Sequence, residues 1–378
     1  MRTAARIDGL GTTIFTEMTA LAERTGSINL GQGFPDHGGP AEVIEAAVQA
    51  LRGGANQYAP LSGVSALREA VLEHQRRCYG LEPEDVLVTF GATEAIAAAL
   101  LALCEPGDEV VLFEPYYDSY PACVSFAGAK RRVVTLEPPS FKLDRDRLLE
   151  AIEGGHGRAR VMVVNTPHNP TGRVFGRAEL TLVAETCAKH DLVCISDEVY
   201  EHLVYEGEHV PVASLPGMAE RTLTVSSVGK SFSLTGWKIG WCSGPAELVA
   251  AARAVKQYLT FAGGTPLQHA AAVALRLPEV HLTRLRDELR ANRDELCQGL
   301  RAAGWTVFEP AATYFVNADI GHDANRFCAE LPQRCGVVAI PTGVFYDAPD
   351  AAPSLVRFAF CKRPEVIAEA AARLASLT

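Results

Sequence analysis

The chain has 378 residues, of which 48% are hydrophobic and 21% are charged, a balance that is typical of globular proteins and excludes a wholly disordered chain. Acidic residues outnumber basic residues by 45 to 35, giving a formal charge of −10, which argues against a surface for nucleic acid or anionic lipid. The length exceeds the size at which a single hydrophobic core usually stops growing, so we expect two domains.

Short apolar runs alternate with longer segments of helical spacing over the first two thirds of the chain. The runs are Val86–Phe90, Val110–Phe113, Val161–Val164, Leu192–Ile195 and Leu223–Val225. Runs rich in Val, Ile and Leu are typical of strands buried on both faces of a mostly parallel sheet. The segments Ala178–His190 and Ala246–Tyr258 have the length and spacing of helices. The alternation predicts an α/β fold.

The pattern changes beyond about Leu267. A long charged segment, Val280–Ala303, predicts a helix, and the alternating segments Tyr314–Ala318 and Leu355–Phe360 predict strands. A last helical segment reaches the C-terminus. These elements indicate a second, smaller α+β domain.

Neither a membrane segment nor a metal site is expected. The first nine residues hold no apolar leader segment, and the longest apolar stretch, Ala95–Cys104, is too short to span a bilayer. The chain has ten cysteines but no CxxC pair, so we expect buried reduced thiols and no zinc site. Together these features predict a cytoplasmic protein.

Four polar clusters each follow directly on a predicted strand, where open α/β sheets bind ligands. The first, Gly91–Glu94, is a small-residue turn before a helix, which can present backbone N–H groups and the Thr93 hydroxyl to a phosphate. Taken alone it is equally typical of a capped helix. The second, Asn165–Gly172, carries two prolines and a glycine that fix a rigid loop around Asn169.

The third cluster, Ser196–Tyr200, places the Asp197 carboxylate at the end of a buried strand. A buried carboxylate needs a partner, and a protonated pyridine nitrogen would be one. Tyr200, three residues further on, can reach a ring hydroxyl beside that nitrogen. The simpler alternative is that Asp197 only caps a helix.

The fourth cluster, Ser226–Trp241, contains Lys230 among small hydroxylated residues and Lys238 eight residues later. A desolvated lysine can act as a nucleophile towards carbonyls, and a second cation can balance a phosphate. Arg357 lies in an alternating strand pattern that favours a solvent-facing side chain. Facing a substrate site, it would bind a carboxylate in a bidentate way.

Taken in series, these motifs resemble the class I and class II pyridoxal-phosphate-dependent aminotransferases of fold type I. The resemblance extends from Asn29–Asp36 to Arg357–Lys362, and the run Ser226–Trp241 is its most specific part. It implies a large domain over residues 29–266, with a mostly parallel sheet flanked by helices, and a small α+β domain over residues 267–378. Residues 1–28 are expected to form an arm that packs with the small domain.

The resemblance also implies catalytic roles. Lys230 would hold pyridoxal 5'-phosphate as a Schiff base and act as the general base. Asp197 would pair with the pyridinium nitrogen, and Tyr200 and Asn169 would bond the ring oxygen. Tyr117, in the run Glu114–Tyr120, would stack on the ring face.

The remaining roles concern the phosphate, the substrate and a second subunit. Residues implied to hold the phosphate are Ala92, Thr93, Ser227 and Lys238. Tyr58 would reach the phosphate of a neighbouring subunit, because the resemblance implies a homodimer with shared active sites. Gly33, Asn169 and Arg357 would receive the substrate carboxylate.

The implied reaction moves an amino group from an L-amino acid to a 2-oxo acid such as 2-oxoglutarate. The segments Gly31–Asp36 and Gly54–Pro60 resemble the kynurenine, glutamine and methionine aminotransferase branch, which implies an apolar, aromatic or sulfur-containing donor. The segments Gln257–Leu259 and Gly263–Gly264 resemble N-succinyldiaminopimelate aminotransferases equally well. No obvious second arginine is present for a side-chain carboxylate, which argues against a dedicated aspartate enzyme.

Two further alternatives share the same motifs. A cysteine-conjugate or cystathionine β-lyase would use the same residues and differ only in its products. A cofactor-binding regulatory domain without turnover would normally be fused to a DNA-binding module, and the chain begins almost directly in the predicted fold, with no basic helix–turn–helix before it.

Overall fold

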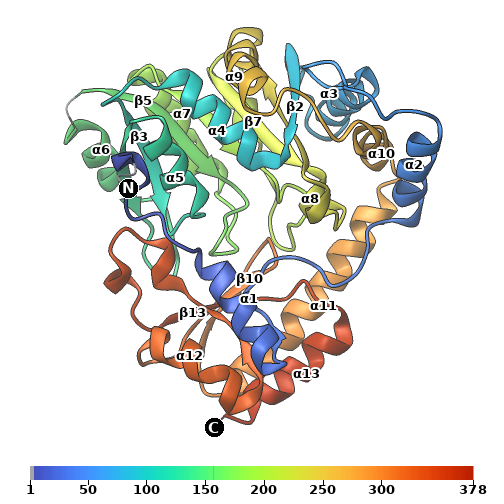
Figure 1. Ribbon diagram of the computed structural model, residues 1–378. Helices are drawn as coiled ribbons and strands as arrows, with labels where there is room; N and C mark the ends of the chain where they lie inside the picture. Colours follow the sequence, from blue (N-terminus) through green and yellow to red (C-terminus); the bar gives the residue numbers. More distant parts are fainter. Residues whose placement is uncertain (1–3, 156, 378) are drawn as a thin grey trace.

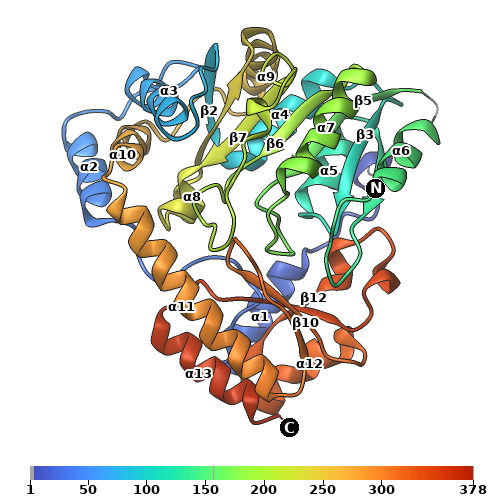
Figure 2. The ribbon, with the colours of Figure 1, turned by 180° about the vertical axis from the view of Figure 1, so that it is seen from behind.

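The computed structural model describes residues 4–155 and 157–377, and its main element is a seven-stranded sheet (Figures 1 and 2). The strand order is β2-β8-β7-β6-β5-β3-β4, and β8 alone runs antiparallel to its neighbours. The strands are β2 (Asp85–Phe90), β3 (Glu109–Glu114), β4 (Lys130–Thr135), β5 (Ala159–Asn165), β6 (Val193–Asp197), β7 (Thr222–Ser227) and β8 (Ile239–Gly244). All five strands predicted in this region are confirmed, as is the α/β fold with a mostly parallel sheet.

Two strands of this sheet were not predicted from sequence. β4, with the sequence KRRVVT, lies at the edge and leaves its first two residues exposed, so it has no apolar run. β8, with the sequence IGWCSG, is fully buried between β2 and β7. Glycine and serine are typical of loops, so its sequence does not predict a strand. The strand is buried because these small residues allow close backbone packing.

Helices cover both faces of the sheet, as Figure 1 shows for α4, α5, α7 and α9. The helices are α1 (Ile14–Thr25), α2 (Ala41–Arg52), α3 (Ser65–Tyr79), α4 (Gly91–Leu103), α5 (Ser119–Phe126), α6 (Arg145–Glu153), α7 (Arg177–Lys189), α8 (Val228–Ser231), α9 (Ala246–Leu259), α10 (Thr265–Leu275), α11 (Val280–Ala302), α12 (Ala324–Cys335) and α13 (Pro364–Ala375). Alternate side chains of β3 and β5 pack towards α4, α5 and α9 on one face and towards α6 and α7 on the other. The strands are therefore buried on both faces, as their composition predicts.

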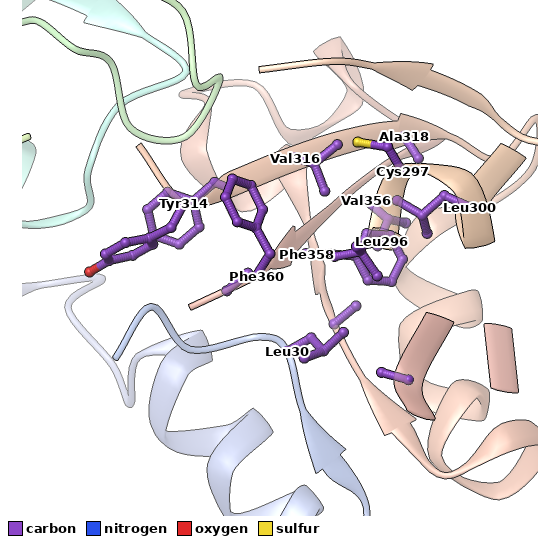
Figure 3. Close-up of a cluster of buried hydrophobic side chains, with 14 of the residues drawn as sticks. Leu30, Leu296, Cys297, Leu300, Tyr314, Val316, Ala318, Val356, Phe358 and Phe360 are labelled. Atoms are coloured by element: carbon purple, nitrogen blue, oxygen red, sulfur yellow. The ribbon is translucent and has the colours of Figure 1, made fainter. Parts of the chain in front are cut away.

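A four-stranded antiparallel sheet, in the order β12-β13-β10-β9, forms a second core. The strands outside the large sheet are β1 (Ile28–Asn29), β9 (Thr306–Phe308), β10 (Phe315–Asp319), β11 (Val337–Val338), β12 (Ile340–Pro341) and β13 (Leu355–Ala359). Figure 3 shows side chains of this core, with Leu296 and Leu300 of α11 near Phe358 of β13. The same core includes Tyr200, so it reaches the residues that follow β6 in the large sheet.

The packing of α1, α10 and α11 bears on the proposed division into domains. α1 lies against α12 and β11, which supports an N-terminal arm that packs with the small domain. α10 packs against α2 and α3, and α11 packs against α13. We therefore move the proposed boundary from residues 266–267 to the link between α10 and α11, where Figure 2 shows α11 running towards the small sheet. Residues 1–3 of the proposed arm and residue 378 lie outside the described residues.

Over residues 4–155 and 157–377, no helix combines the length and the apolar character needed to cross a membrane.

Candidate active site

A cavity of about 410 Å³ lies where the carboxyl ends of β5, β6 and β7 meet β10 and β13 of the small sheet. This volume is within the range of small-molecule sites. The sequence-predicted residues that line the cavity are Gly33, Ala92, Thr93, Tyr117, Asn169, Asp197, Tyr200, Ser227, Lys230, Lys238 and Arg357. The structure thus brings together all four polar clusters, although they span almost 150 residues of sequence.

Asp197 is the last residue of β6 and is held in place by backbone and side-chain contacts. The Tyr120 hydroxyl donates to Asp197 Oδ2 at 2.6 Å, and the Val199 backbone N–H donates to Asp197 Oδ1 at 3.3 Å. Burial raises the pKa of Asp197 to about 6, and the Tyr120 hydrogen bond opposes that rise. A cationic nitrogen in the cavity would remove the cost of burying this carboxylate.

Lys230 lies on α8, the short helix that follows β7. Its Nζ is 5.8 Å from the ring centre of Tyr200 and 5.7 Å from that of Tyr314. Burial lowers the pKa of Lys230 to about 8. A larger fraction of this amine is therefore neutral near pH 7 than for an exposed lysine, and the neutral form is the nucleophile and the base.

The N-terminus of α4 and Lys238 form one end of the cavity. Gly91 and Lys238 both have left-handed backbone conformations, with φ of 72° and 54°. The β8 strand approaches so closely that a Cβ on Gly240 would lie 2.8 Å from the Ala92 nitrogen. The Lys238 amine also comes within 3.2 Å of the place where a Cβ on Gly91 would be. A helix N-terminus with a nearby ammonium group is well suited to bind phosphate.

Arg357 approaches the cavity from β13 and is completely buried. The alternation of its strand favours a solvent-facing side chain, and that interpretation is wrong because the cavity and rings cover this face. Its Nη1 donates to Asn169 Oδ1 at 3.0 Å, and its Nη2 donates to the Gly31 carbonyl at 2.9 Å. The guanidinium lies 4.1 Å from the ring centre of Phe315 and 4.6 Å from that of Phe345.

The Arg357 guanidinium remains positively charged although it is buried. Burial lowers the pKa of its guanidinium to about 10, which still leaves the group protonated at neutral pH. Its Nε is buried and has no hydrogen-bond partner. A buried cation with a free donor beside a cavity can bind an incoming carboxylate.

Tyr58 does not line the cavity. Its side chain is 80% exposed and contacts the ring of Phe261, with ring centres 5.5 Å apart. In a single chain it therefore takes no part in this site, and its implied role requires a second subunit.

Several cavity residues were not predicted. Tyr120 of α5 holds Asp197 from 77 residues away. Gln32 donates from Nε2 to the Phe15 carbonyl at 2.9 Å, which fixes α1 over the cavity. Phe34 and Phe315 add aromatic rings to the lining. Tyr120 belongs to the run Glu114–Tyr120, but nothing in that run indicates which tyrosine faces Asp197.

These residues fit pyridoxal 5'-phosphate. A carboxylate for a ring nitrogen, an amine for an aldehyde, and a helix N-terminus with Lys238 for a phosphate all face one cavity. The Tyr117 ring also lines the cavity, 5.8 Å from the ring of Tyr120, and offers an aromatic face to a cofactor ring.

The family model for aminotransferase class I and II matches residues 25–374. The solved structure of N-succinyldiaminopimelate aminotransferase from Mycobacterium tuberculosis is 49% identical, with a TM-score of 0.96 and full coverage of both chains. Methionine aminotransferase from Escherichia coli is 41% identical, over 99% of this chain and 98% of its own. Human kynurenine–oxoglutarate transaminase 1 is 36% identical, over 95% of this chain and 94% of its own.

Proposed function

The chain belongs to the class I and II aminotransferases, which are enzymes that use pyridoxal 5'-phosphate, and from this we propose that it carries out amino transfer in the cavity around Lys230. The observation that carries this proposal is the convergence of Lys230, Asp197 and Arg357 from three separate elements on one cavity. The reaction requires three groups of the protein: an amine to hold the cofactor, a carboxylate to pair with the ring nitrogen, and a cation to bind the substrate carboxylate.

Bound cofactor supplies an electron sink for the negative charge that develops at the substrate α-carbon. The chain's own residues would do the rest. Lys230 Nζ would hold the cofactor and, once the substrate amine has displaced it, would take the proton from the α-carbon and deliver it to the cofactor. Asp197 holds a proton at the ring nitrogen, and Tyr120 keeps that carboxylate in position. Arg357 binds the α-carboxylate, which orients the α-carbon towards Lys230.

The other predicted residues would hold the cofactor. Tyr200 and Asn169 would donate to the ring oxygen, and Tyr117 would pack on the ring face. The proposed phosphate site consists of Ala92, Thr93, Ser227 and Lys238. Gly33 would present its backbone to the substrate carboxylate beside Arg357. The Tyr314 hydroxyl donates to the Gly33 carbonyl at 2.6 Å and fixes that segment.

We propose that the donor has an apolar, aromatic or sulfur-containing side chain and that 2-oxoglutarate serves as an acceptor. Among the described residues that line the cavity, Arg357 is the only arginine. The rings of Phe15 and Phe315 lie against its guanidinium, and Phe34 also lines the cavity, so the space beyond the α-carboxylate favours an apolar group.

N-succinyldiaminopimelate is the second candidate substrate. It is favoured by the 49% identity to the M. tuberculosis enzyme of that name over the full length of both chains. Its extra carboxylates would need a cation besides Arg357, Lys230 and Lys238, and the described lining of the cavity of one chain holds no other. A second subunit could supply one.

We also propose a homodimer in the cytoplasm. Tyr58 is exposed on one chain although its implied role is to bind phosphate, and a partner's cavity would give it that role. All ten cysteines are free, which supports a reducing compartment.

The test is a spectral titration of the cofactor-loaded protein with a panel of amino acids and no oxo acid. Loss of the visible band of the lysine-bound cofactor, with formation of its amine form and one equivalent of oxo acid, would support amino transfer. The donor with the fastest change identifies the substrate class, and N-succinyldiaminopimelate belongs in the panel. A stable band with accumulating pyruvate and ammonia would instead indicate the β-lyase.

A further inference from the structure

A second cluster of reactive side chains lies outside the cofactor cavity, where α3 meets the segment that follows β6. His74, Cys78 and His202 each offer one ligand atom there, and the three atoms lie within 4.8 Å of one another. His74 Nε2 and His202 Nε2 are 2.7 Å apart, and their rings cross at 87°. The two imidazoles thus direct the same nitrogen into one small space, and the Cys78 thiol borders it.

The backbone explains how these groups meet. His74 and Cys78 are four residues apart on α3, so they lie on one face of the helix. His202 comes from a segment 128 residues further along the chain. The cluster joins two distant segments, so it has no local signature such as CxxC. For this reason no metal site was expected from the sequence.

The surroundings of the cluster are acidic and buried. Glu198 and Glu201 are both buried. Glu201 Oε1 accepts from Ser226 Oγ at 2.6 Å, whereas Glu198 accepts from Ser196 Oγ at 2.7 Å and from the Val212 N–H at 3.1 Å and contacts His209 Nε2 at 2.9 Å. Across the described part of the chain, neither carboxylate forms an ion pair with a lysine or arginine. A buried carboxylate without a full cationic partner is costly, so a cation bound beside Glu201 would stabilise this region.

Arg77 is not the cation that balances these carboxylates. It lies beside the Cys78 thiol but is exposed, and its Nη2 donates to the Leu275 carbonyl at 2.9 Å. His74 is only 1% exposed, and an imidazole nitrogen is the commonest protein ligand for a metal ion.

We propose that His74, Cys78 and His202 form a binding site for a divalent cation of the zinc type. Two imidazole nitrogens and a thiolate are a ligand set that Zn²⁺ prefers over Mg²⁺ or Ca²⁺. Tetrahedral zinc would separate these ligand atoms by roughly 3.3–3.6 Å, so shifts of about 1 Å or less would complete the site. Cys78 is exposed, which gives the ion an entry path and leaves the fourth position to water.

Such an ion would tie α3 to the segment that carries Tyr200 into the cofactor cavity. His202 is two residues from Tyr200, and Glu201 bonds Ser226 beside Ser227 of the same cavity. The three ligands would therefore brace the segment behind Tyr200, and metal binding there can be measured without the reaction that we propose for the cavity.

The test is calorimetric titration of ZnCl₂ into the untagged, cofactor-loaded protein after treatment with a chelator. We expect one Zn²⁺ per chain with a Kd below about 1 μM, and a rise in melting temperature on saturation. Cys78→Ser and His202→Asn should each weaken binding at least tenfold and remove the rise in melting temperature.

Cys335→Ser is the matched control. Like Cys78, Cys335 lies at the end of a helix before a glycine in the left-handed conformation, but it has no histidine partner in the cluster. This variant should bind Zn²⁺ as the wild type does. If the wild type binds no Zn²⁺ below about 100 μM, or if Cys78→Ser binds it equally well, His74 and His202 merely share a hydrogen bond and the proposal fails.

Discussion

The two walls of the cavity obtain their polarity in different ways. The wall formed by the large sheet, here called the cofactor wall, carries Asp197 at the end of β6 and Lys230 on α8, which follows β7. The opposite wall, here called the substrate wall, is built from Phe15, Phe315 and Arg357 and is aromatic apart from one guanidinium. The cofactor wall concentrates ionisable groups, and the substrate wall isolates a single charge among rings.

Because of this difference, proton transfer belongs to the cofactor wall and substrate recognition belongs to the substrate wall. Burial shifts the pKa values of Asp197 and Lys230 towards neutrality, to about 6 and about 8, so the cofactor wall is suited to moving protons. The substrate wall holds Arg357 permanently charged, so it is suited to binding. Substitutions in the cofactor wall should therefore lower kcat for every substrate, whereas those in the substrate wall should change KM or the preference among donors.

The largest effect is expected from Lys230→Ala in the cofactor wall. Removing the amine removes both the attachment of the cofactor and the general base, so turnover should fall by at least 10²–10⁴-fold, the usual contribution of such a base. Steady-state rates measure the loss, and an added small primary amine should restore part of it. Wild-type activity in this variant would contradict the assignment of Lys230.

Asp197→Asn tests the other group of the cofactor wall. The amide keeps the shape of the side chain but cannot hold a proton at the ring nitrogen, so kcat should fall by about 10²–10³-fold, as for loss of one electrostatic group. The variant should still bind cofactor, which its absorption spectrum would report. An unchanged kcat would remove Asp197 from the mechanism.

Arg357→Lys probes the substrate wall while keeping its charge. A lysine loses the fork that bonds Asn169 and Gly31, so KM should rise about tenfold or more, equivalent to about 1.4 kcal/mol. The rise should be similar for every amino acid, because all carry the α-carboxylate. A loss confined to acidic donors would instead place Arg357 at a side-chain subsite.

The pH dependence of cofactor capture gives an effect of about tenfold. Burial lowers the pKa of Lys230 from 10.5 to about 8, so the amine is mostly protonated at pH 7 and mostly neutral at pH 9. The rate at which cofactor-free protein attaches the cofactor should therefore rise about tenfold between these values and then level off. A rate that still rises about eightfold between pH 9 and pH 10 would show an unshifted lysine.

The smallest effect is expected from Phe15→Ala in the substrate wall. Phe15 is only partly buried, so its loss should reduce kcat/KM for phenylalanine or methionine by about fivefold, or about 1 kcal/mol. Alanine as donor is the control and should change less. An equal change for all donors would mean that Phe15 supports Arg357 and not the side-chain pocket.

Sequence and structure agree best where burial is uniform. The five Val-, Ile- and Leu-rich runs became strands because both of their faces are covered. β4 was not predicted because its edge position leaves basic side chains exposed, so it has no apolar run. β8 was not predicted because it is built from small residues, which allow close backbone packing. Within the cofactor wall, the residue at each strand end was predictable because parallel strands end at one edge of the sheet.

Contacts between distant segments were not predictable. Tyr120 meets Asp197, and His74 meets His202, only because helices α5 and α3 pack beside the sheet. Arg357 was expected on a solvent face because its strand alternates, yet the cavity and the ring of Phe315 cover it. Each of these depends on packing that a single sequence does not encode locally.

The most direct test of the account is to reduce the cofactor-loaded protein with borohydride and map the modified lysine by mass spectrometry. Reduction fixes the cofactor to the nitrogen that holds it. The account predicts the label on Lys230, with Lys238 of the same cavity unlabelled. A label on another lysine, or none after loading with pyridoxal 5'-phosphate, would contradict the assignment of this cavity as the site of amino transfer.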